Sequence, residues 1–234
     1  IMPSLVGSEM CIRDRYLMAR AAKQAGTPAI RTSSIRDVIA IKEETGLPVI
    51  GLVKIQYPGY EGYITPTMKE VDDLVAAGSD VVALDCTLRK RGDGITVNEF
   101  IAQIKEKYPD IILMADISNY EEGINAWKCG VDIVGTTMSG YTDYTSKKDE
   151  PDYELMERLA KDTDIPVIGE GKIHYPDQAV KALQTGVWAI VVGGAITRPL
   201  EIAQRFQKAI EAGVPAVMMG NVILSLIHIS EPTR

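Results

Sequence analysis

Short apolar runs alternate with amphipathic stretches along almost the whole chain from Tyr16 to Ile210. The apolar runs are nearly continuous, which is typical of parallel strands buried on both faces. Regular alternation of such strands with helices indicates parallel βα units and an α/β fold. The predicted strands are Pro28–Arg31, Pro48–Lys54, Val81–Asp85, Ile111–Asp116, Ile133–Gly135, Pro166–Glu170 and Trp188–Val192. The predicted helices are Tyr16–Ala25, Ser34–Glu44, Met68–Ala77, Val97–Lys107, Tyr120–Lys128, Asp152–Lys161, Asp177–Gln184 and Leu200–Ile210.

Glycines directly before several strands predict where the preceding helices end. These helix-stop positions are Gly26, Gly46, Gly78, Gly130 and Gly186. The pattern gives seven strands and eight helices and starts with a helix. Eight βα units close into a (β/α)₈ barrel of about 250 residues. We therefore predict a TIM barrel that lacks its native first strand, as a single domain over residues 16–210; an open doubly wound sheet is the alternative.

The two ends of the chain share one explanation at the level of DNA. The segments LVGSEMCIRDR (Leu5–Arg15) and LSLIHISEPTR (Leu224–Arg234) can be encoded by opposite strands of a single DNA element. This element resembles a sequencing adapter that has been translated with the reading frame. We therefore exclude residues 1–15 and 224–234 from the fold, as one excludes an expression scar. The interpretation implies a natural sequence truncated at its front, and it leaves residues 211–223 as a tail of undetermined structure.

Charge and cysteine usage limit the class of partner and the compartment. A net charge of −7 argues against nucleic acid or an anionic membrane surface as a partner. Three cysteines are too few, and odd in number, for a disulfide framework, so a reducing compartment such as the cytoplasm is expected. No apolar run reaches the roughly 18 residues of a membrane span, and no segment has the layout of a signal peptide.

The predicted strands end in charged or small residues. In such barrels the active site lies at the carboxyl ends of the strands. The strand ends supply both signs of charge, so the alternative is a structural network of ion pairs that closes the barrel mouth. The residues at these ends are Arg31, Lys54, Asp85, Asp116, the threonines that follow Gly135, Glu170, Gly193 and Gly194.

Lys54 and Glu170 each end a long apolar run, in LPVIGLVK and IPVIGE. A lysine in a partly apolar site has a lowered pKa and can act as a base near neutrality; alternatively, Lys54 extends to the rim and is solvated. Glu170 could act as an acid or base, or could simply pair with Lys54. Gly171, directly after Glu170, would let the backbone approach a ligand closely.

The segment from Gly193 to Arg198 predicts a phosphate site. Gly193 and Gly194 end the last strand, and backbone N–H groups at such a turn can bind phosphate, with Arg198 adding a charged contact. The alternative is a glycine turn beside a surface arginine. Asp85 and Asp116 could orient sugar hydroxyls or polarise Lys54.

Metal and thiol chemistry are not expected from this sequence. No histidine cluster accompanies the aspartates, so we predict no metal site. Cys86 has no histidine partner and is not expected to be a nucleophile. His174, a lone loop histidine, is expected to be solvent-exposed or to support the site from outside.

Eight stretches of the chain, in order, match one enzyme family. They are IRTSSIRDVIAIKE, LPVIGLVK, YPGYEGYITPTMKEVDDLVAAGSD, ALDCTLRKRGDG, MADIS, VGTTMSGYT, IPVIGEGKIHYP and VVGGAITRP. On these motifs the chain resembles the N-acetylmannosamine-6-phosphate 2-epimerases from residue 16 to about residue 210. The family's first strand ends in a polar segment that faces the substrate, and here the adapter-like sequence replaces it.

The resemblance implies a cofactor-free barrel enzyme of amino-sugar and sialic-acid catabolism. Its substrate would be a sugar phosphate, and the reaction would interconvert N-acetylmannosamine 6-phosphate and N-acetylglucosamine 6-phosphate. Lys54 matches the catalytic base, Glu170 matches the glutamate that assists it, and the residues matching Arg31, Asp116 and Arg198 contact the substrate.

Two other functions remain open from the sequence. One is another phosphate-binding barrel enzyme, of the pentose-phosphate epimerase or synthase type. The other is a truncated barrel without activity, since a barrel that lacks one strand has exposed edges. A homodimeric state of the intact parent is also left open.

Overall fold

The computed structural model describes residues 15–147 and 149–213. The chain divides after Val192 into two compact units, which are described separately. The strands of the first unit are β1 (Ile30–Ser33), β2 (Val49–Leu52), β3 (Val81–Asp85), β4 (Ile112–Asp116), β5 (Ile133–Gly135), β6 (Val167–Glu170) and β7 (Ala189–Val191). Its helices are α2 (Arg15–Gln24), α3 (Ile35–Thr45), α4 (Met68–Ala76), α5 (Val97–Lys107), α6 (Tyr120–Lys128), α7 (Tyr153–Asp162) and α8 (Pro176–Gln184).

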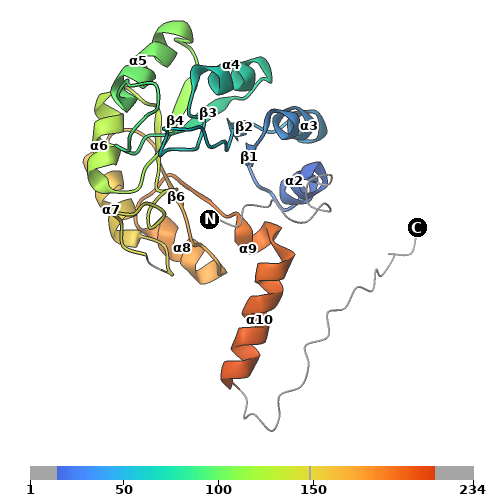
Figure 1. The fold of residues 1–234 in the computed structure, drawn as a ribbon. Helices are drawn as coiled ribbons and strands as arrows, with labels where there is room; N and C mark the ends of the chain where they lie inside the picture. Colours follow the sequence, from blue (N-terminus) through green and yellow to red (C-terminus); the bar gives the residue numbers. More distant parts are fainter. Residues whose placement is uncertain (1–14, 148, 214–234) are drawn as a thin grey trace. The chain divides into compact units, whose positions relative to one another are not determined.

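The seven strands pair in chain order and every pair is parallel. In Figure 1 the strands occupy the centre of this unit and the helices that connect them lie around the outside. The predicted α/β fold of the TIM-barrel type is confirmed. Within the described residues the strand order runs from β1 to β7, so these two strands each have one strand neighbour.

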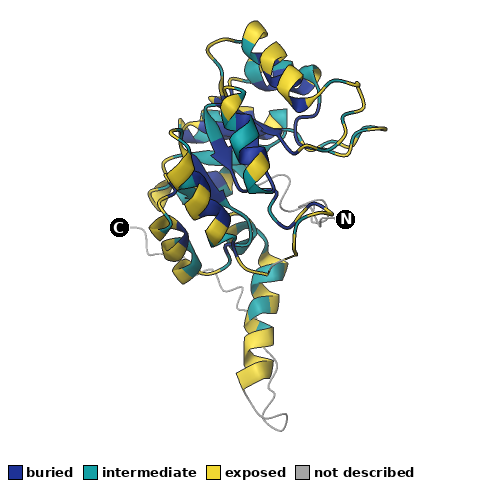
Figure 2. Ribbon diagram, turned by 90° about the vertical axis from the view of Figure 1, so that its left-hand side faces the viewer, coloured by how far each residue is buried: buried dark blue, intermediate teal, exposed yellow. Residues whose placement is uncertain are grey.

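Along β2, successive side chains alternate between two apolar clusters, as the pleat of a β-strand requires. Ile50 and Leu52 belong to an interior cluster between the strands. Val49, from the opposite face of the same strand, belongs to the larger cluster between the strands and the helices. In Figure 2 buried residues follow the strands and the inward helix faces of this unit, whereas exposed residues line the outward helix faces.

Local sequence signals account for the helix boundaries. Thr96 and Glu99 form a reciprocal capping box at the start of α5. Gly46 ends α3 in the left-handed conformation with φ 63°, where a side chain would be strained. The five predicted helix-stop glycines all have positive φ, from 63° to 94°. The helix ends predicted from these glycines are therefore confirmed.

The ends of β1 and β2 differ from their predicted positions. β1 begins at Ile30, because Ile30 donates the first ladder bond to Pro48, whereas Pro28 carries no backbone N–H. β2 ends at Leu52 instead of Lys54. Beyond it the chain stays extended and Lys54 forms an isolated antiparallel bridge with Ile64, so the following loop folds back on the strand end.

The second unit contains two helices in its described part. Gly193 precedes a single helical turn, α9 (Gly194–Thr197), which was not predicted as a separate element. The amphipathic helix α10 (Pro199–Gly213) follows and extends past the predicted end at Ile210. The adapter-like segments, except Arg15, and the remainder of the predicted tail lie outside the described residues. The single domain over residues 16–210 stays a prediction.

Close packing at Gly51 of β2 leads to a stability prediction. A Cβ atom at Gly51 would lie 2.2 Å from Ser79 Oγ and 3.0 Å from a Leu74 methyl carbon, and both side chains are buried. We expect Gly51→Ala to lower the free energy of unfolding by about 1–3 kcal/mol, because an overpacked core must shift.

Thermal melts of Gly51→Ala and of a matched control test this expectation. At Gly213, a Cβ atom would meet nothing within 4 Å, so Gly213→Ala should leave the melting temperature nearly unchanged. Equal melting temperatures for the two variants would contradict the packing argument.

Candidate active site

Three charged side chains from three distant strands meet inside the first unit. Arg31 of β1 lies with its Nη2 atom 2.6 Å from Asp116 Oδ2 of β4. The Nε atom of Arg31 lies 3.2 Å from Glu170 Oε2 of β6. The side chains of Arg31 and Asp116 are 7% and 0% exposed, and that of Glu170 is 18% exposed. The structure therefore brings together three of the residues that were predicted from strand ends.

The electrostatic balance of this cluster is one cation for two carboxylates. Burial alone would lower the pKa of Arg31, but attraction to Asp116 and Glu170 leaves that pKa above its ordinary value. Burial raises the pKa of Glu170, and the charge of Asp116 adds to the rise, while Arg31 opposes it. A carboxyl group with a raised pKa can hold a proton closer to neutrality, which suits an acid–base role.

Thr137 connects the two carboxylates. It follows β5, and its Oγ1 atom lies 2.7 Å from Asp116 Oδ1 and 3.1 Å from Glu170 Oε2. The neighbouring Thr136 hydroxyl accepts from the backbone N–H of Glu170 and donates to its carbonyl oxygen. The threonines that follow Gly135 thus fix both the backbone and the side chain at the end of β6.

Lys54 stands at a different place from the one its sequence position suggested. Its side chain is exposed, whereas the sequence predicted a charge at the end of a buried strand. The reason is that β2 stops two residues earlier and the chain leaves the sheet through the bridge to Ile64. The positive charge of Lys54 still acts on Glu170, whose pKa it lowers, so Lys54 faces the same cluster.

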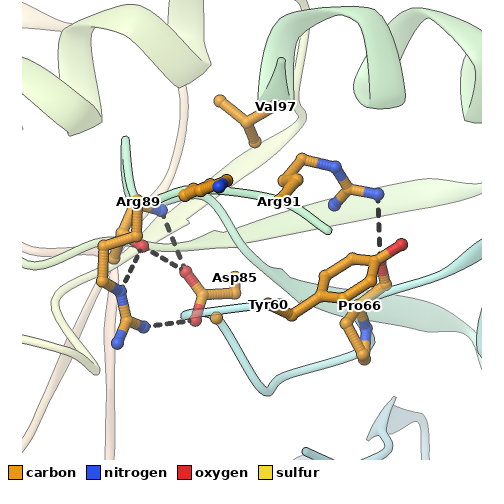
Figure 3. Close-up of a pocket in the computed structure, with 9 residues that line it drawn as sticks. Tyr60, Pro66, Asp85, Arg89, Arg91 and Val97 are labelled. Carbon is orange, nitrogen blue, oxygen red and sulfur yellow. Dashed lines mark hydrogen bonds and ion pairs between the residues drawn. The ribbon is translucent and has the colours of Figure 1, made fainter. Parts of the chain in front are cut away.

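Asp85 is held by its own loop. Its Oδ1 atom accepts from the backbone and the hydroxyl of Thr87, and its Oδ2 atom lies 2.6 Å from Arg89 Nη2. Figure 3 shows the side chains of Asp85 and Arg89 directed toward one another. Burial raises the pKa of Asp85, and the Arg89 cation opposes this rise. Asp85 and Arg89 line a small pocket together with Tyr60 and Arg91.

Gly171 has the backbone freedom that was expected after Glu170. Its φ angle is 103°, a conformation that a side chain would strain. A Cβ atom there would lie 3.7 Å from the carbonyl oxygen of Thr136. The next residue, Lys172, also has a positive φ angle, and its ammonium lies 5.3 Å from the centre of the Tyr141 ring.

The predicted phosphate segment belongs to the second unit. Gly193 precedes helix α9, whose amides at Ile196 and Thr197 donate to the Gly193 carbonyl oxygen. Arg198 lies with its Nη1 atom 2.5 Å from Glu201 Oε1. Gly194 packs against these two side chains, because a Cβ atom there would lie 3.1 Å from Glu201 Oε2.

Two residues near the strand ends were missed from the sequence. Tyr63 lies against the interior cluster, its hydroxyl 3.7 Å from Met138 Sδ, and burial raises its pKa to about 12. Arg89 pairs with Asp85 and lies 5.9 Å from the centre of the Tyr63 ring. Neither residue directly precedes or follows a strand in the sequence, so the strand pattern does not mark them.

The residues that were not expected to do chemistry have ordinary surroundings. Burial raises the pKa of the Cys86 thiol well above its usual range, which disfavours the reactive thiolate. His174 is partly buried, and its backbone N–H donates to Gln178. Between residues 15 and 213, with residue 148 excepted, three or more potential metal ligands nowhere gather into a site. In the same part of the chain no helix has the length and apolar character that a membrane crossing needs.

Comparison with known proteins gives one consistent result. The family model described as "Putative N-acetylmannosamine-6-phosphate epimerase" matches residues 16–212. One relative is the "Putative N-acetylmannosamine-6-phosphate 2-epimerase" of Caldanaerobacter subterraneus subsp. tengcongensis. It is 55% identical over 189 residues, which are 81% of this chain and 80% of that protein. Another from Clostridioides difficile is 50% identical over 194 residues, 83% of this chain and 86% of that protein.

Solved structures agree with the sequence comparison. The N-acetylmannosamine-6-phosphate 2-epimerase from Clostridium perfringens superposes with a TM-score of 0.81 at 45% identity and covers 89% of each chain. A thiamine phosphate pyrophosphorylase from Pyrococcus furiosus has a TM-score of 0.55 at 20% identity, over 81% of this chain and 84% of that one. The second likeness concerns the fold alone.

Proposed function

Because this chain belongs to the N-acetylmannosamine-6-phosphate 2-epimerase family, we propose that it interconverts N-acetylmannosamine 6-phosphate and N-acetylglucosamine 6-phosphate. The reaction inverts C2 of the sugar, next to the C1 aldehyde of its open-chain form. It requires a base that removes the C2 proton, a group that returns a proton, stabilisation of the enolate oxygen and a hold on the phosphate. The alternative of a pentose-phosphate epimerase or synthase has no support in the family match.

The observation that carries the proposal is the buried cluster of Arg31, Asp116 and Glu170, with Lys54 facing it. In the proposed mechanism Lys54 removes the C2 proton. Glu170, whose pKa burial raises, returns a proton or steadies the charge that develops. Arg31 and Asp116 orient the substrate, and Arg31 supplies positive charge near the enolate oxygen.

The remaining assignments rest on the sequence. Asp85 is assigned to substrate hydroxyls, and Gly171 to the phosphate. Gly193, Gly194 and Arg198 are assigned to phosphate as well. The proposal includes no cofactor and no metal ion.

The cellular setting is part of the same proposal. A sugar phosphate is the small-molecule partner, and nucleic acid and membranes are not partners, in line with the net charge of −7. A cytoplasmic location fits the low and odd cysteine number. A homodimer of the intact parent remains part of the hypothesis.

Proton NMR of N-acetylmannosamine 6-phosphate with this protein in deuterated water tests the proposal. We expect the C2–H signal to disappear as the glucosamine epimer forms, because the base exchanges its proton with solvent before returning it. Unchanged C2–H signals with a folded protein would contradict the proposal and would favour the alternative of a barrel without activity.

A further inference from the structure

One hydroxyl serves two carboxylates at the centre of the candidate site. The Thr137 Oγ1 atom lies within hydrogen-bond distance of Asp116 Oδ1, at 2.7 Å, and of Glu170 Oε2, at 3.1 Å. A hydroxyl has a single hydrogen to donate but can also accept. When both carboxylates are ionised, the hydroxyl can therefore donate fully to one of them only.

The two carboxylates differ in how well they are otherwise satisfied. Asp116 is fully buried, and its Oδ2 atom already lies 2.6 Å from Arg31 Nη2. Glu170 has the longer contact to Arg31, at 3.2 Å, and is partly exposed. A protonated Glu170 could donate to Thr137 Oγ1 while the hydroxyl donates to Asp116. An ionised Glu170 instead competes with Asp116 for the hydroxyl hydrogen.

Charged groups from several elements surround Asp116 and Glu170. Glu170 is faced by Arg31 from β1, by Asp116 from β4 and by Lys54 from the loop after β2. The charge of Asp116 also acts on Asp85, Tyr63 and Cys86. The Thr137 hydroxyl contacts both Asp116 and Glu170, so it is placed to stabilise the ionised form of Glu170.

We infer that Thr137 is a positioning residue whose hydroxyl joins Asp116 and Glu170 in one hydrogen-bonded unit, so that the ionisation of Glu170 depends on the Thr137 hydroxyl. The inference rests on the proposed function only for its catalytic meaning. In the epimerisation, Glu170 would give a proton to the sugar and become ionised. The hydroxyl hydrogen would then turn from Asp116 to Glu170, while Arg31 continues to hold Asp116.

The first test does not require activity. Carboxyl ¹³C NMR of the whole protein, with the Glu170 resonance identified by its loss in Glu170→Gln, reports the titration midpoint of Glu170. We expect Thr137→Val to raise this midpoint by about one pH unit, because a hydrogen bond to an ionised group is of that strength. Thr137→Ser keeps the hydroxyl and should keep the midpoint within a few tenths of a unit.

A second variant separates this effect from loss of stability. Thr45 in α3 is also buried, and its hydroxyl donates to the Ile41 carbonyl oxygen, away from the cluster. Thr45→Val should leave the Glu170 midpoint unchanged. In the epimerase assay Thr137→Val should lower kcat about tenfold with little change in KM. Thr137→Ser should keep kcat close to that of the unmodified protein.

The inference is wrong if Thr137→Val leaves the Glu170 midpoint where it is in the unmodified protein, or if Thr137→Ser shifts it equally. Failure of the proposed function is recognised separately. In that case the unmodified protein would show no C2 exchange, while the titration of Glu170 would still report whether Thr137 couples the two carboxylates.

Discussion

Replacing Lys54 with methionine is expected to slow exchange of the C2 proton of N-acetylmannosamine 6-phosphate by about 10³-fold. A positioned general base contributes roughly 10²–10⁴-fold to such a reaction, and methionine has no proton-accepting nitrogen. Because the Lys54 side chain is exposed and lies beyond the end of β2, its loss should leave the barrel intact. The expected result is therefore a large loss of rate at an almost constant melting temperature.

The rate is measured as loss of the C2–H signal in deuterated water, and the fold by thermal melts. Lys69→Met is the matched control: Lys69 is an exposed lysine of α4, paired with Asp73 one helical turn away. Such surface pairs contribute little, so this control should keep both rate and stability. A Lys54→Met protein that exchanges C2–H at the unmodified rate would remove Lys54 from the mechanism.

Replacing Arg31 with methionine is expected to lower the free energy of unfolding by about 3–5 kcal/mol. The Arg31 side chain is buried against Asp116 and Glu170, and removal of one partner leaves buried negative charge without compensation. Activity should also be lost, because the substitution removes the cation assigned to the enolate oxygen.

The loss of stability in Arg31→Met should depend on pH. Arg31 is a charge that lowers the pKa of Glu170, so its removal raises that folded-state pKa further above the unfolded value. A group whose folded-state pKa is raised stabilises the fold at low pH, and this stabilisation disappears as pH rises through the folded-state pKa. The variant should therefore lose less stability at pH 5 than at pH 8, relative to the unmodified protein.

Urea denaturation at the two pH values measures this difference. Arg20→Met serves as the control, because Arg20 forms an exposed pair with Glu44 and its loss should change stability little at either pH. An Arg31→Met protein as stable as the unmodified chain at pH 8 would show that the cluster is not held by this ion pair.

Much of the fold could be predicted because its signals are local. Continuous apolar runs mark strands that are buried on both faces, and glycines of positive φ mark the helix ends. The predicted strand ends were wrong where hydrogen bonding between segments distant in sequence decides where a strand begins and ends. β1 is displaced toward Ser33 because its partner strand β2 offers bonds as far as Leu52.

The candidate site was predictable for residues at the predicted strand ends and not for residues within the longer loops. Arg31, Asp116 and Glu170 stand out because each is a charge that ends an apolar run. Thr137 was predicted as one of the threonines that follow Gly135, whereas Tyr63 and Arg89 carry no such mark, since a ring or a charge in a loop is common in any sequence. Only the structure shows that Thr137 contacts Asp116 and Glu170 and that Tyr63 packs against the interior cluster.

By itself the sequence determined the order of strands and helices, the family, and the charges at the strand ends. Only the tertiary structure decided which of these charges meet. Arg31 and Asp116 are 85 positions apart, and their ion pair depends on the parallel register through β2 and β3. It also decided that Lys54 is exposed, because a bridge to Ile64 draws the chain out of the sheet. Propensity acts over a few neighbouring residues, whereas a contact depends on how the whole sheet closes.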